Sequence, residues 1–359
     1  MNISLGIVGL PNVGKSTLFN ALTKKQAPAE NYPFCTIDPN IGIVPVRDER
    51  LEKIADIVKP AQVVPAVVEF YDIAGLVKGA SSGEGLGNKF LSNIREVSAI
   101  VHVVRMFTNS NILHVENSVS PERDIEIINT ELILKDIETI TKRLVTLAKQ
   151  ARQDKLAASG LAHMEVLAKH LDSGKLALDL PLSDEAAGPF RQELQLLTDK
   201  PVMYVVNVEP ERSAEAIAKI QSIVGDKIVV PMDVKLEAEI MEMDDSERSE
   251  FMESFGLDMT GLERLTREAY KLLGLASFLT AGEKEAKAWT FPLGYTAKQA
   301  AGVIHTDFTK NFIAAEIVSS SDYLELGGWE GAKAAGKLRL EGKEYIMRDG
   351  DVVLFKVNT

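Results

Sequence analysis

Gly9-Leu10-Pro11-Asn12-Val13-Gly14-Lys15-Ser16 is the stretch that decides the fold, because it spells G-x-x-x-x-G-K-S between an apolar run and a helical one. Residues 3–8 before it read as a buried strand, and residues 17–22 after it read as a helix. In this context the glycines let backbone N–H groups turn toward phosphates, and the helix start adds a favourable dipole. The lysine would neutralise the terminal phosphates and the serine hydroxyl would hold Mg²⁺. The predicted nucleoside triphosphate site consists of Asn12, Val13, Gly14, Lys15, Ser16 and Thr17.

The size and composition are those of a globular protein with more than one domain. Of 359 residues, 45% are hydrophobic and 26% are charged. We find no apolar run of bilayer length and no signal peptide, so we expect no membrane partner. The single cysteine, Cys35, excludes an internal disulfide framework, which favours a reducing, cytoplasmic location. The net charge of −12 argues against a wholly basic nucleic-acid coat, and we expect no DNA partner.

Apolar, β-branched runs alternate with helical patterns through much of the chain. Six runs predict strands, at residues 3–10, 41–46, 63–71, 99–107, 202–208 and 227–234. This alternation predicts an α/β domain with a mostly parallel sheet, whose ligand loops lie at the carboxyl ends of the strands. We assign residues 1–122 and 200–279 to this nucleotide-binding domain.

A helical insertion separates the fourth and fifth predicted strands. From Ile133 to Ala151, apolar residues recur at alternating steps of four and three, which is the pattern of an a/d seam. Ser159-Gly160 would form the turn of a helical hairpin, so residues 123–199 are predicted to be a helical arm. Residues 135–155 carry six basic and three acidic side chains, a net +3 that could meet RNA phosphates. On this count alone, a solvated helix face is the simpler interpretation.

Residues 280–359 predict a small α+β domain. Strands are expected at residues 289–294, 312–318 and 345–347, and a capped helix at residues 296–301. Arg348-Asp349-Gly350-Asp351 is a strong turn signal before a last strand at residues 352–357.

A second acidic motif follows the third predicted strand. Asp72-Ile73-Ala74-Gly75 reads D-x-x-G, so Asp72 would reach Mg²⁺ through a water and the Gly75 N–H would sense the γ-phosphate. Thr36 lies in the loop after the first helix, where the first switch threonine of a G-protein domain would ligate Mg²⁺. Ser16, Thr36 and Asp72 are therefore the predicted magnesium set.

The predicted base pocket lacks the groups that read guanine. GTP-specific domains place Asn-Lys-x-Asp after the fifth strand, whereas this chain has Asn207-Val208-Glu209-Pro210. Each unpaired guanine donor in a buried site would cost about 1–3 kcal/mol. The Ser-Ala-Lys loop after the sixth strand is also altered, to Asp233-Val234-Lys235. We therefore predict ATP rather than GTP, with Asn207, Val208 and Glu209 at the base.

The usual catalytic glutamine is missing. Many switch GTPases carry Gln directly after D-x-x-G to orient the attacking water, but this chain has Leu76, so hydrolysis should be slow. His114, in the loop after the fourth predicted strand, is a candidate replacement, although a lone histidine is more often a surface or packing residue. The glycine-rich residues 78–87 after Leu76 read as a second switch.

Together these residues resemble the Obg-like ATPase family, also called YchF. The resemblance rests on residues 9–17, Thr36 in Asn-Tyr-Pro-Phe-Cys-Thr, the D-x-x-G motif followed by Leu76, and residues 83–87. It continues through the Asn207 motif, Leu279-Thr280-Ala281-Gly282 and residues 302–308, and so covers essentially the whole chain. One departure is that the family usually has Asn-x-x-Glu, where this chain has Pro210 in the fourth place.

The resemblance implies a Ras-like P-loop domain, a coiled-coil insertion and a C-terminal TGS domain of β-grasp type. It also implies Mg²⁺-dependent ATP hydrolysis and association with the ribosome or its large subunit, in translation-related or stress regulation, with ribosomal RNA at the arm. Two alternatives stay open: a GTPase with a degenerate base pocket, and a non-hydrolysing, nucleotide-gated ribosome adaptor, which Leu76 favours.

Overall fold

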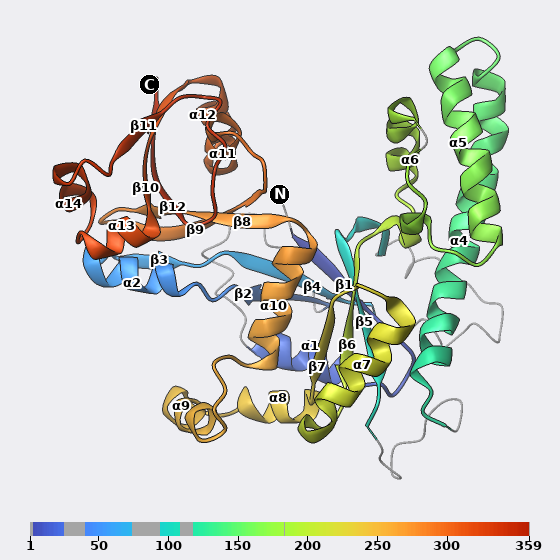
Figure 1. The fold of residues 1–359 in the computed structure, drawn as a ribbon, viewed down its shortest axis with the longest axis horizontal. Coiled ribbons are helices and arrows are strands. Elements are labelled where there is room, and N and C mark those ends of the chain that lie inside the picture. The colour runs from blue at the N-terminus through green and yellow to red at the C-terminus, as the bar shows by residue number, and fades with distance from the viewer. Residues whose placement is uncertain (1–2, 25–39, 74–93, 108–117, 183, 359) are drawn as a thin grey trace.

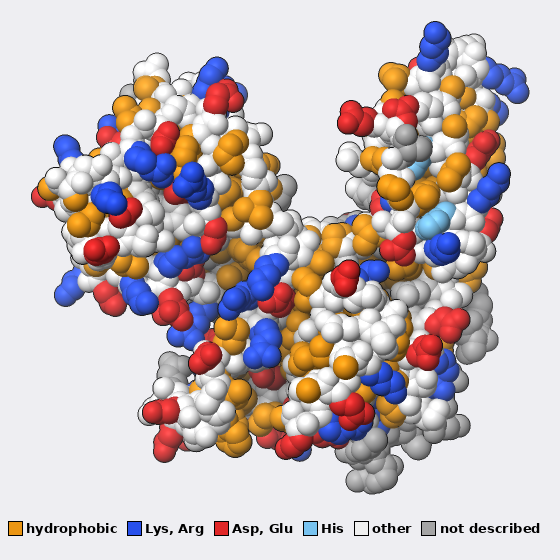
Figure 2. All heavy atoms as spheres, in the orientation of Figure 1, with side chains coloured by type: hydrophobic (Ala, Val, Ile, Leu, Met, Phe, Trp, Pro, Cys, Tyr) orange, Lys and Arg blue, Asp and Glu red, His pale blue; other side chains and the backbone are white. Residues whose placement is uncertain are grey.

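The computed structural model describes residues 3–24, 40–73, 94–107, 118–182 and 184–358 (Figure 1). Two sheets and a helical arm make up the described chain. The arm and the second sheet rise from opposite sides of the first sheet, and Figure 2 shows an open cleft between them.

The first sheet has six strands in the order β2-β4-β1-β5-β6-β7. All neighbouring pairs are parallel except β2 and β4, which are antiparallel. All residues of β1 and β5 are buried, as expected for central strands covered on both faces. The strands are β1 Ser4–Val8, β2 Ile41–Pro45, β4 Val67–Asp72, β5 Ala99–Arg105, β6 Val202–Asn207 and β7 Val229–Met232.

Helices cover this sheet and begin at polar caps. α1 (Lys15–Lys24) buries Leu18, Phe19, Ala21 and Leu22 against it. α10 (Gly261–Leu272) begins with a capping box between Thr260 and Glu263, which satisfies two N–H groups at the helix start. The other helices of this part are α7 Ser213–Val224, α8 Val234–Ile240 and α9 Asp245–Ser254.

The arm is a hairpin of α4 (Pro121–Gln150) and α5 (Lys155–Asp172). Its apolar seam packs as one buried cluster that includes Ile133, Ile140, Leu147, Met164 and Leu167. The seam was predicted correctly, but the predicted turn at Ser159-Gly160 is wrong. The turn lies at residues 151–154, where Asp154 caps α5 by accepting from the Leu156 N–H at 2.8 Å.

Gly160 lies inside α5 for a packing reason. A Cβ at this position would come within 2.6 Å of the Phe190 ring, so the missing side chain makes room for Phe190. From sequence alone, a glycine that lets another residue pack closely against a helix cannot be told apart from a glycine that forms a turn. Phe190 lies on α6 (Gly188–Leu194), which contacts α5 in the return from the arm.

A fully buried carboxylate fixes the base of the arm. Asp136 on α4 accepts hydrogen bonds from the Leu197 N–H at 2.8 Å and from both the N–H and the hydroxyl of Thr198 at 2.7 Å. Burial raises the pKa of Asp136, while these donors oppose that shift. The return segment before β6 is therefore tied directly to the arm.

The second sheet has the order β11-β10-β12-β8-β9-β3. Its strands are β3 Gln62–Val64, β8 Leu275–Ala281, β9 Glu285–Pro292, β10 Phe312–Ser319, β11 Arg339–Glu341 and β12 Asp351–Val357. α11 (Ala297–Ile304) packs on it and carries the expected cap at Thr296. Short helices connect the strands: α12 Thr306–Lys310, α13 Ser320–Glu325 and α14 Trp329–Ala334.

Two strand predictions are wrong in informative ways. The run at residues 63–71 is two strands, β3 and β4, which lie in different sheets on either side of Pro65 and Ala66. Proline cannot donate to a sheet ladder, and here it stands at the point where the chain passes between sheets. Residues 345–347 make only an isolated bridge, between Ile346 and Thr296, and β11 takes the edge position instead.

Candidate nucleotide-binding site

The glycine loop joins the end of β1 to the start of α1. Asn12 and Gly14 adopt positive φ values of 61° and 106°. A Cβ on Gly14 would lie 2.5 Å from Nδ2 of Asn207, so this position needs glycine for its conformation and its space. Ser16 and Thr17 are exposed on the first turn of α1. The positive end of the α1 dipole is thus available to an anion at this loop.

Lys15 bends back into the loop. Its Nζ donates to the carbonyl oxygen of Leu10 at 2.6 Å. Burial lowers the pKa of Lys15 to about 8, and the nearby charge of Asp72 opposes this shift. The ammonium is therefore held without full compensation and would gain from a phosphate partner.

Asp72 ends β4 and pairs with Ile7 of β1, so the sheet brings it beside the loop. Burial raises its pKa, while Lys15 opposes that shift. Its Oδ1 is buried and has no hydrogen-bond partner among the described residues. A buried carboxylate oxygen without a donor, at the end of the strand beside the glycine loop, fits a magnesium site in which a water bridges to Asp72.

The Asn207 side chain links segments of the protein through hydrogen bonds. Its Nδ2 donates to the carbonyl oxygen of Val13 at 3.0 Å, and its Oδ1 accepts from the Val234 N–H at 3.2 Å. The side chain therefore ties the glycine loop to the segments that follow β6 and β7. Both amide atoms are engaged within the protein.

The other two predicted base-pocket residues differ in exposure. The Val208 side chain is only 1% exposed, and its N–H donates to the Met232 carbonyl oxygen at 3.1 Å. Glu209 is half-buried, with its Oε2 at 3.8 Å from a guanidinium nitrogen of Arg212. Asp233 caps α8 by accepting from the N–H groups of Lys235 and Leu236.

Several predicted site residues lie outside the described part of the chain. These are Thr36, Gly75, Leu76 and His114. Of the predicted set, the structure brings together the glycine loop, Asp72 and Asn207.

Two residues on β5 were missed from the sequence. Arg105 is 2% exposed and lies over the Phe107 ring at 4.1 Å, and its Nη1 donates to the Asn12 carbonyl oxygen at 3.4 Å. His102 is fully buried, and its burial and the charge of Lys15 lower its pKa to about 3, so it stays neutral. The signal was present, because polar residues interrupting a buried strand near its carboxyl end point to the ligand side of a parallel sheet.

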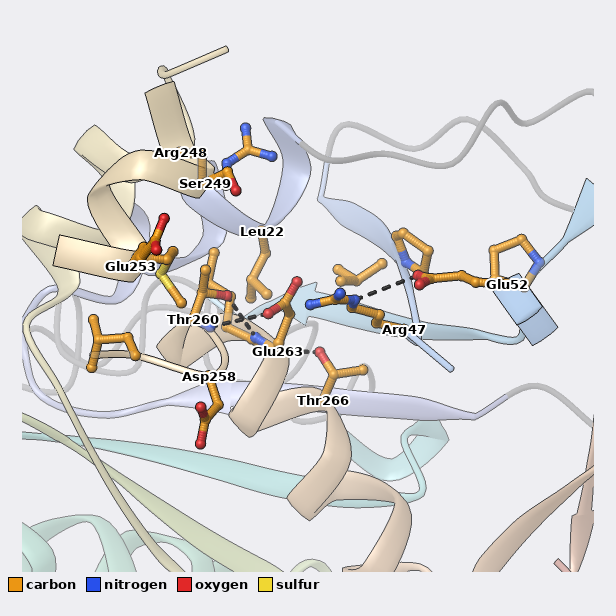
Figure 3. Close-up of a pocket in the computed structure, with 16 residues that line it drawn as sticks. Leu22, Arg47, Glu52, Arg248, Ser249, Glu253, Asp258, Thr260, Glu263 and Thr266 are labelled. Carbon is orange, nitrogen blue, oxygen red and sulfur yellow. Dashed lines mark hydrogen bonds and ion pairs between the residues drawn. The ribbon is translucent and has the colours of Figure 1, made fainter. Parts of the chain in front are cut away.

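A large cavity of about 900 Å³ lies elsewhere. It opens between α9 and α10 on one side and β2 with the start of α2 (Glu49–Val58) on the other (Figure 3). None of the residues lining it belongs to the glycine loop or to the ends of β5 and β6. Chemistry, rather than cavity size, locates the nucleotide site.

The arrangement belongs to the Ras-like class of P-loop nucleotide-binding proteins, in which a phosphate loop follows the first strand of this sheet and an acidic residue ends the neighbouring strand. Comparison with known families narrows the class. The pattern described as 50S ribosome-binding GTPase matches residues 4–149. The pattern of the YchF GTPase C-terminal domain, described as a protein of unknown function, matches residues 275–358.

Similar proteins cover the whole chain. It is 51% identical to a protein of Escherichia coli O157:H7 and 50% identical to one of Bacillus subtilis strain 168, both named ribosome-binding ATPase YchF, over 100% of each chain. The structure of the Schizosaccharomyces pombe YchF GTPase superposes with a TM-score of 0.86 at 38% identity, covering 99% of this chain and 98% of that one. The chain belongs to the YchF family.

The predicted fold class is therefore confirmed: a Ras-like P-loop domain, an inserted helical coiled-coil arm and a C-terminal β-grasp (TGS) domain. Among the helices that the structure describes, none is long and apolar enough to cross a membrane.

Proposed function

We propose that this protein binds ATP with Mg²⁺, hydrolyses it slowly, and associates with the ribosome in a way that depends on its nucleotide state. The observation that carries the proposal is the position of Asp72, which lies opposite Ile7 of β1 at the end of β4 and near enough to Lys15 of the glycine loop for each charge to affect the pKa of the other. The two groups are buried enough to perturb both pKa values, and each gains from a magnesium–phosphate partner.

The predicted site residues have separate roles in binding phosphate, binding the metal and orienting water. The loop from Asn12 to Thr17 holds the phosphates through backbone N–H groups and the Lys15 ammonium. Ser16, Thr36 and, through a water, Asp72 hold the metal, which when bound supplies charge neutralisation at the phosphates. Gly75 senses the γ-phosphate, Leu76 explains slow turnover, and His114 is the proposed group that orients the water.

ATP is preferred over GTP because Val208 and Pro210 stand where the lysine and aspartate of the guanine-reading motif would stand. Asp233 already accepts two hydrogen bonds as the cap of α8. Glu209 lies beside Arg212, which balances its charge. Val208 is buried and has no amine stem to cover a base. We place the base beside Asn207, Val208 and Glu209, where adenine, which lacks the N1–H and 2-amino donors of guanine, leaves fewer donors without a partner.

The ribosome is the proposed partner, through ribosomal RNA at the arm. Lys142, Lys149, Arg152 and Lys155 are exposed toward the end of the hairpin, and Figure 2 shows Lys and Arg side chains around its tip. Lys135 and Arg143 are partly engaged with Glu138 and Glu193. An exposed basic tip on an acidic chain suits phosphate contacts. A cytoplasmic location follows from this partner, with neither membrane nor DNA expected.

We also propose the domain division: residues 1–122 and 200–279 for nucleotide, 123–199 for the arm and 280–359 for the C-terminal domain. Strand β3 belongs by sequence to the nucleotide-binding domain but pairs with β9 of the C-terminal domain, so one strand pair joins these two domains.

The proposal is tested by measuring ATP and GTP turnover with and without ribosomes. We expect slow ATP turnover, little GTP turnover and an effect of ribosomes on the ATP rate. Comparable rates for both nucleotides would favour the GTPase alternative. Nucleotide binding without single-turnover hydrolysis, with or without ribosomes, would favour the adaptor that Leu76 suggests.

A further inference from the structure

Residues 46–66, which we call the crossing segment, link the nucleotide site to the C-terminal domain. The segment leaves the first sheet after β2 and returns to it at β4, and the Val46 N–H donates to the Ala66 carbonyl oxygen at 2.8 Å where the two ends meet. Between these ends, β3 pairs in parallel with β9 of the second sheet, from Gln62 opposite Glu285 onward. One continuous segment is therefore built into both sheets.

A clamp of three charged side chains fixes the segment to the C-terminal domain. Arg50 on α2 donates to both carboxylate oxygens of Asp48, at 2.9 and 2.8 Å. Its Nη1 donates to Oδ2 of Asp349 at 2.7 Å, and Asp349 also accepts from the Ser277 N–H of β8 at 2.9 Å. Bonds to the two carboxylates raise the pKa of Arg50 above its ordinary value. A guanidinium shared in this way gives a specific geometry as well as attraction.

The turn that carries Asp349 is shaped around this guanidinium. Gly350 has a φ of 80°, and its N–H donates to the Ser277 carbonyl oxygen at 2.8 Å. A Cβ on Gly350 would lie 2.4 Å from Nη1 of Arg50. Any side chain here would strain the turn and displace the arginine.

The crossing segment is held much less closely by the domain from which it comes. The 900 Å³ cavity is lined by Arg47 and Glu52 and by residues of α9 and α10 (Figure 3). A second cavity of about 450 Å³ lies between residues 46–50, the α10 region and the residues Ser277 and Asp349. α2 contacts β8, β9 and α13, and β3 contacts β9, so the position of the segment is set mainly by its C-terminal partners.

We propose that the crossing segment couples the nucleotide site to the C-terminal domain, with Arg50 and Asp349 as positioning residues for ATP hydrolysis. β4 ends at Asp72, the proposed water-mediated magnesium ligand, and β2 pairs with β4 from Ile41 opposite Tyr71 to Pro45 opposite Val67. A shift of strands β2 and β4 on ATP binding moves the clamp. The C-terminal domain, through the same clamp, in turn favours one position of these two strands. This inference rests on the proposed role of Asp72.

The test is hydrogen exchange of the full-length protein with and without Mg²⁺ and ATP. We expect ATP to change exchange in peptides covering residues 346–358. Arg50→Gln and Gly350→Ala should reduce that change at least about fivefold, as expected when a coupling free energy is lost. The matched control is Arg47→Gln, which breaks the exposed pair with Glu52 in the same segment and should keep the change.

The outcomes separate coupling from simple stability. If the clamp were only structural, Arg50→Gln would lower the melting temperature and leave the ATP-dependent difference in place, which would overturn the proposal. No ATP-dependent change at residues 346–358 in the parent protein would also overturn it. If Arg50→Gln does not fold, Asp349→Asn makes the same test without changing the size of the side chain.

The proposed function can fail separately. Asp72→Asn should weaken the Mg²⁺ dependence of ATP hydrolysis, and unchanged dependence would remove Asp72 from the proposed magnesium site, whatever the exchange measurements show. A different result is that ATP hydrolysis in Arg50→Gln and Gly350→Ala keeps the parent's Mg²⁺ dependence while the ATP-dependent change in hydrogen exchange also stays as in the parent. That result would leave the magnesium site intact and contradict the coupling.

Discussion

The phosphate end and the base end of the proposed nucleotide site differ in how fully their polar groups are hydrogen-bonded within the protein. At the phosphate end, polar groups are left in need of a partner: the Lys15 ammonium is buried with a lowered pKa, and Oδ1 of Asp72 has no donor among the described residues. At the base end, more of the polar atoms are already engaged, since both amide atoms of Asn207 and Oδ1 of Asp233 bond to the protein itself.

The difference indicates where affinity and specificity arise. A buried charge that lacks full compensation gains most from a ligand, so the phosphate end should supply most of the binding free energy. A base end whose groups are already engaged offers little attraction of its own. We expect it to select against guanine because Pro210 supplies no carboxylate for the guanine donors.

The largest expected effect is at the phosphate end. Lys15→Ala should weaken ATP binding by about thirtyfold or more, because truncating one partner of a buried charge pair costs about 2–5 kcal/mol. Titration with a fluorescent ATP analogue measures this. Lys24→Ala is the control, because Lys24 lies on the same helix in an exposed pair with Glu242. Equal losses in the two variants would mean that the phosphates do not lie at the loop.

Asn207→Ala should lower the free energy of unfolding more than it weakens ATP binding. It would leave the Val13 carbonyl and the Val234 N–H buried without their partner, at a cost of about 1–3 kcal/mol each. Denaturant unfolding measures the change, with Asn20→Ala on the exposed face of α1 as a control expected to stay within about 0.5 kcal/mol. Weaker ATP binding at unchanged stability would instead show that Asn207 reads the base directly.

Pro210→Asp tests the base end. Pro210 is exposed at the start of the turn after β6, so an aspartate fits there and supplies the acceptor that guanine needs. We expect the preference for ATP over GTP to fall by about tenfold, matching about 1–3 kcal/mol for restored pairing. Competition between the two nucleotides measures it, with Pro210→Ala as control. If both variants behave alike, the base does not lie beside this residue.

The fold could be predicted where hydrophobic periodicity decides it. The central strands of the first sheet and the arm seam follow from apolar spacing alone, since each buries a continuous face. The split of residues 63–71 between two sheets could not, because the apolar pattern of β3 and β4 is continuous and the partner of β3, strand β9, lies more than two hundred residues later. The role of Gly160 depends on Phe190, which is equally invisible to local pattern.

The site could be predicted where a motif fixes backbone geometry. The glycine loop and Asp72 follow from residue type and strand order. Arg105 and His102 were missed because they depend on which strand ends meet the loop. The bracing role of Asn207 was missed because its two bonds join three segments distant in sequence.

The smallest expected effect is a pH dependence that sharpens the comparison, because the phosphate end titrates near neutrality. With a pKa of about 8, Lys15 loses its proton as pH rises above that value, and binding must then take a proton up. ATP affinity should therefore fall by about three- to tenfold between pH 7.5 and 9, above the range in which phosphate groups titrate. Over the same range the folded state should gain stability, because the unfolded lysine keeps its proton up to its ordinary pKa of 10.5.

Lys15→Arg is the matched control for this profile. A guanidinium stays charged throughout, so its ATP affinity, even if lower overall, should not vary with pH in this range. Isothermal titration across the pH series measures both proteins. A flat profile for the parent protein would mean that Lys15 is not held in its buried, poorly compensated state. If ATP affinity falls as steeply with pH in Lys15→Arg as in the parent, the titrating group is not Lys15. The difference between the phosphate end and the base end could then not be attributed to the buried charge of Lys15.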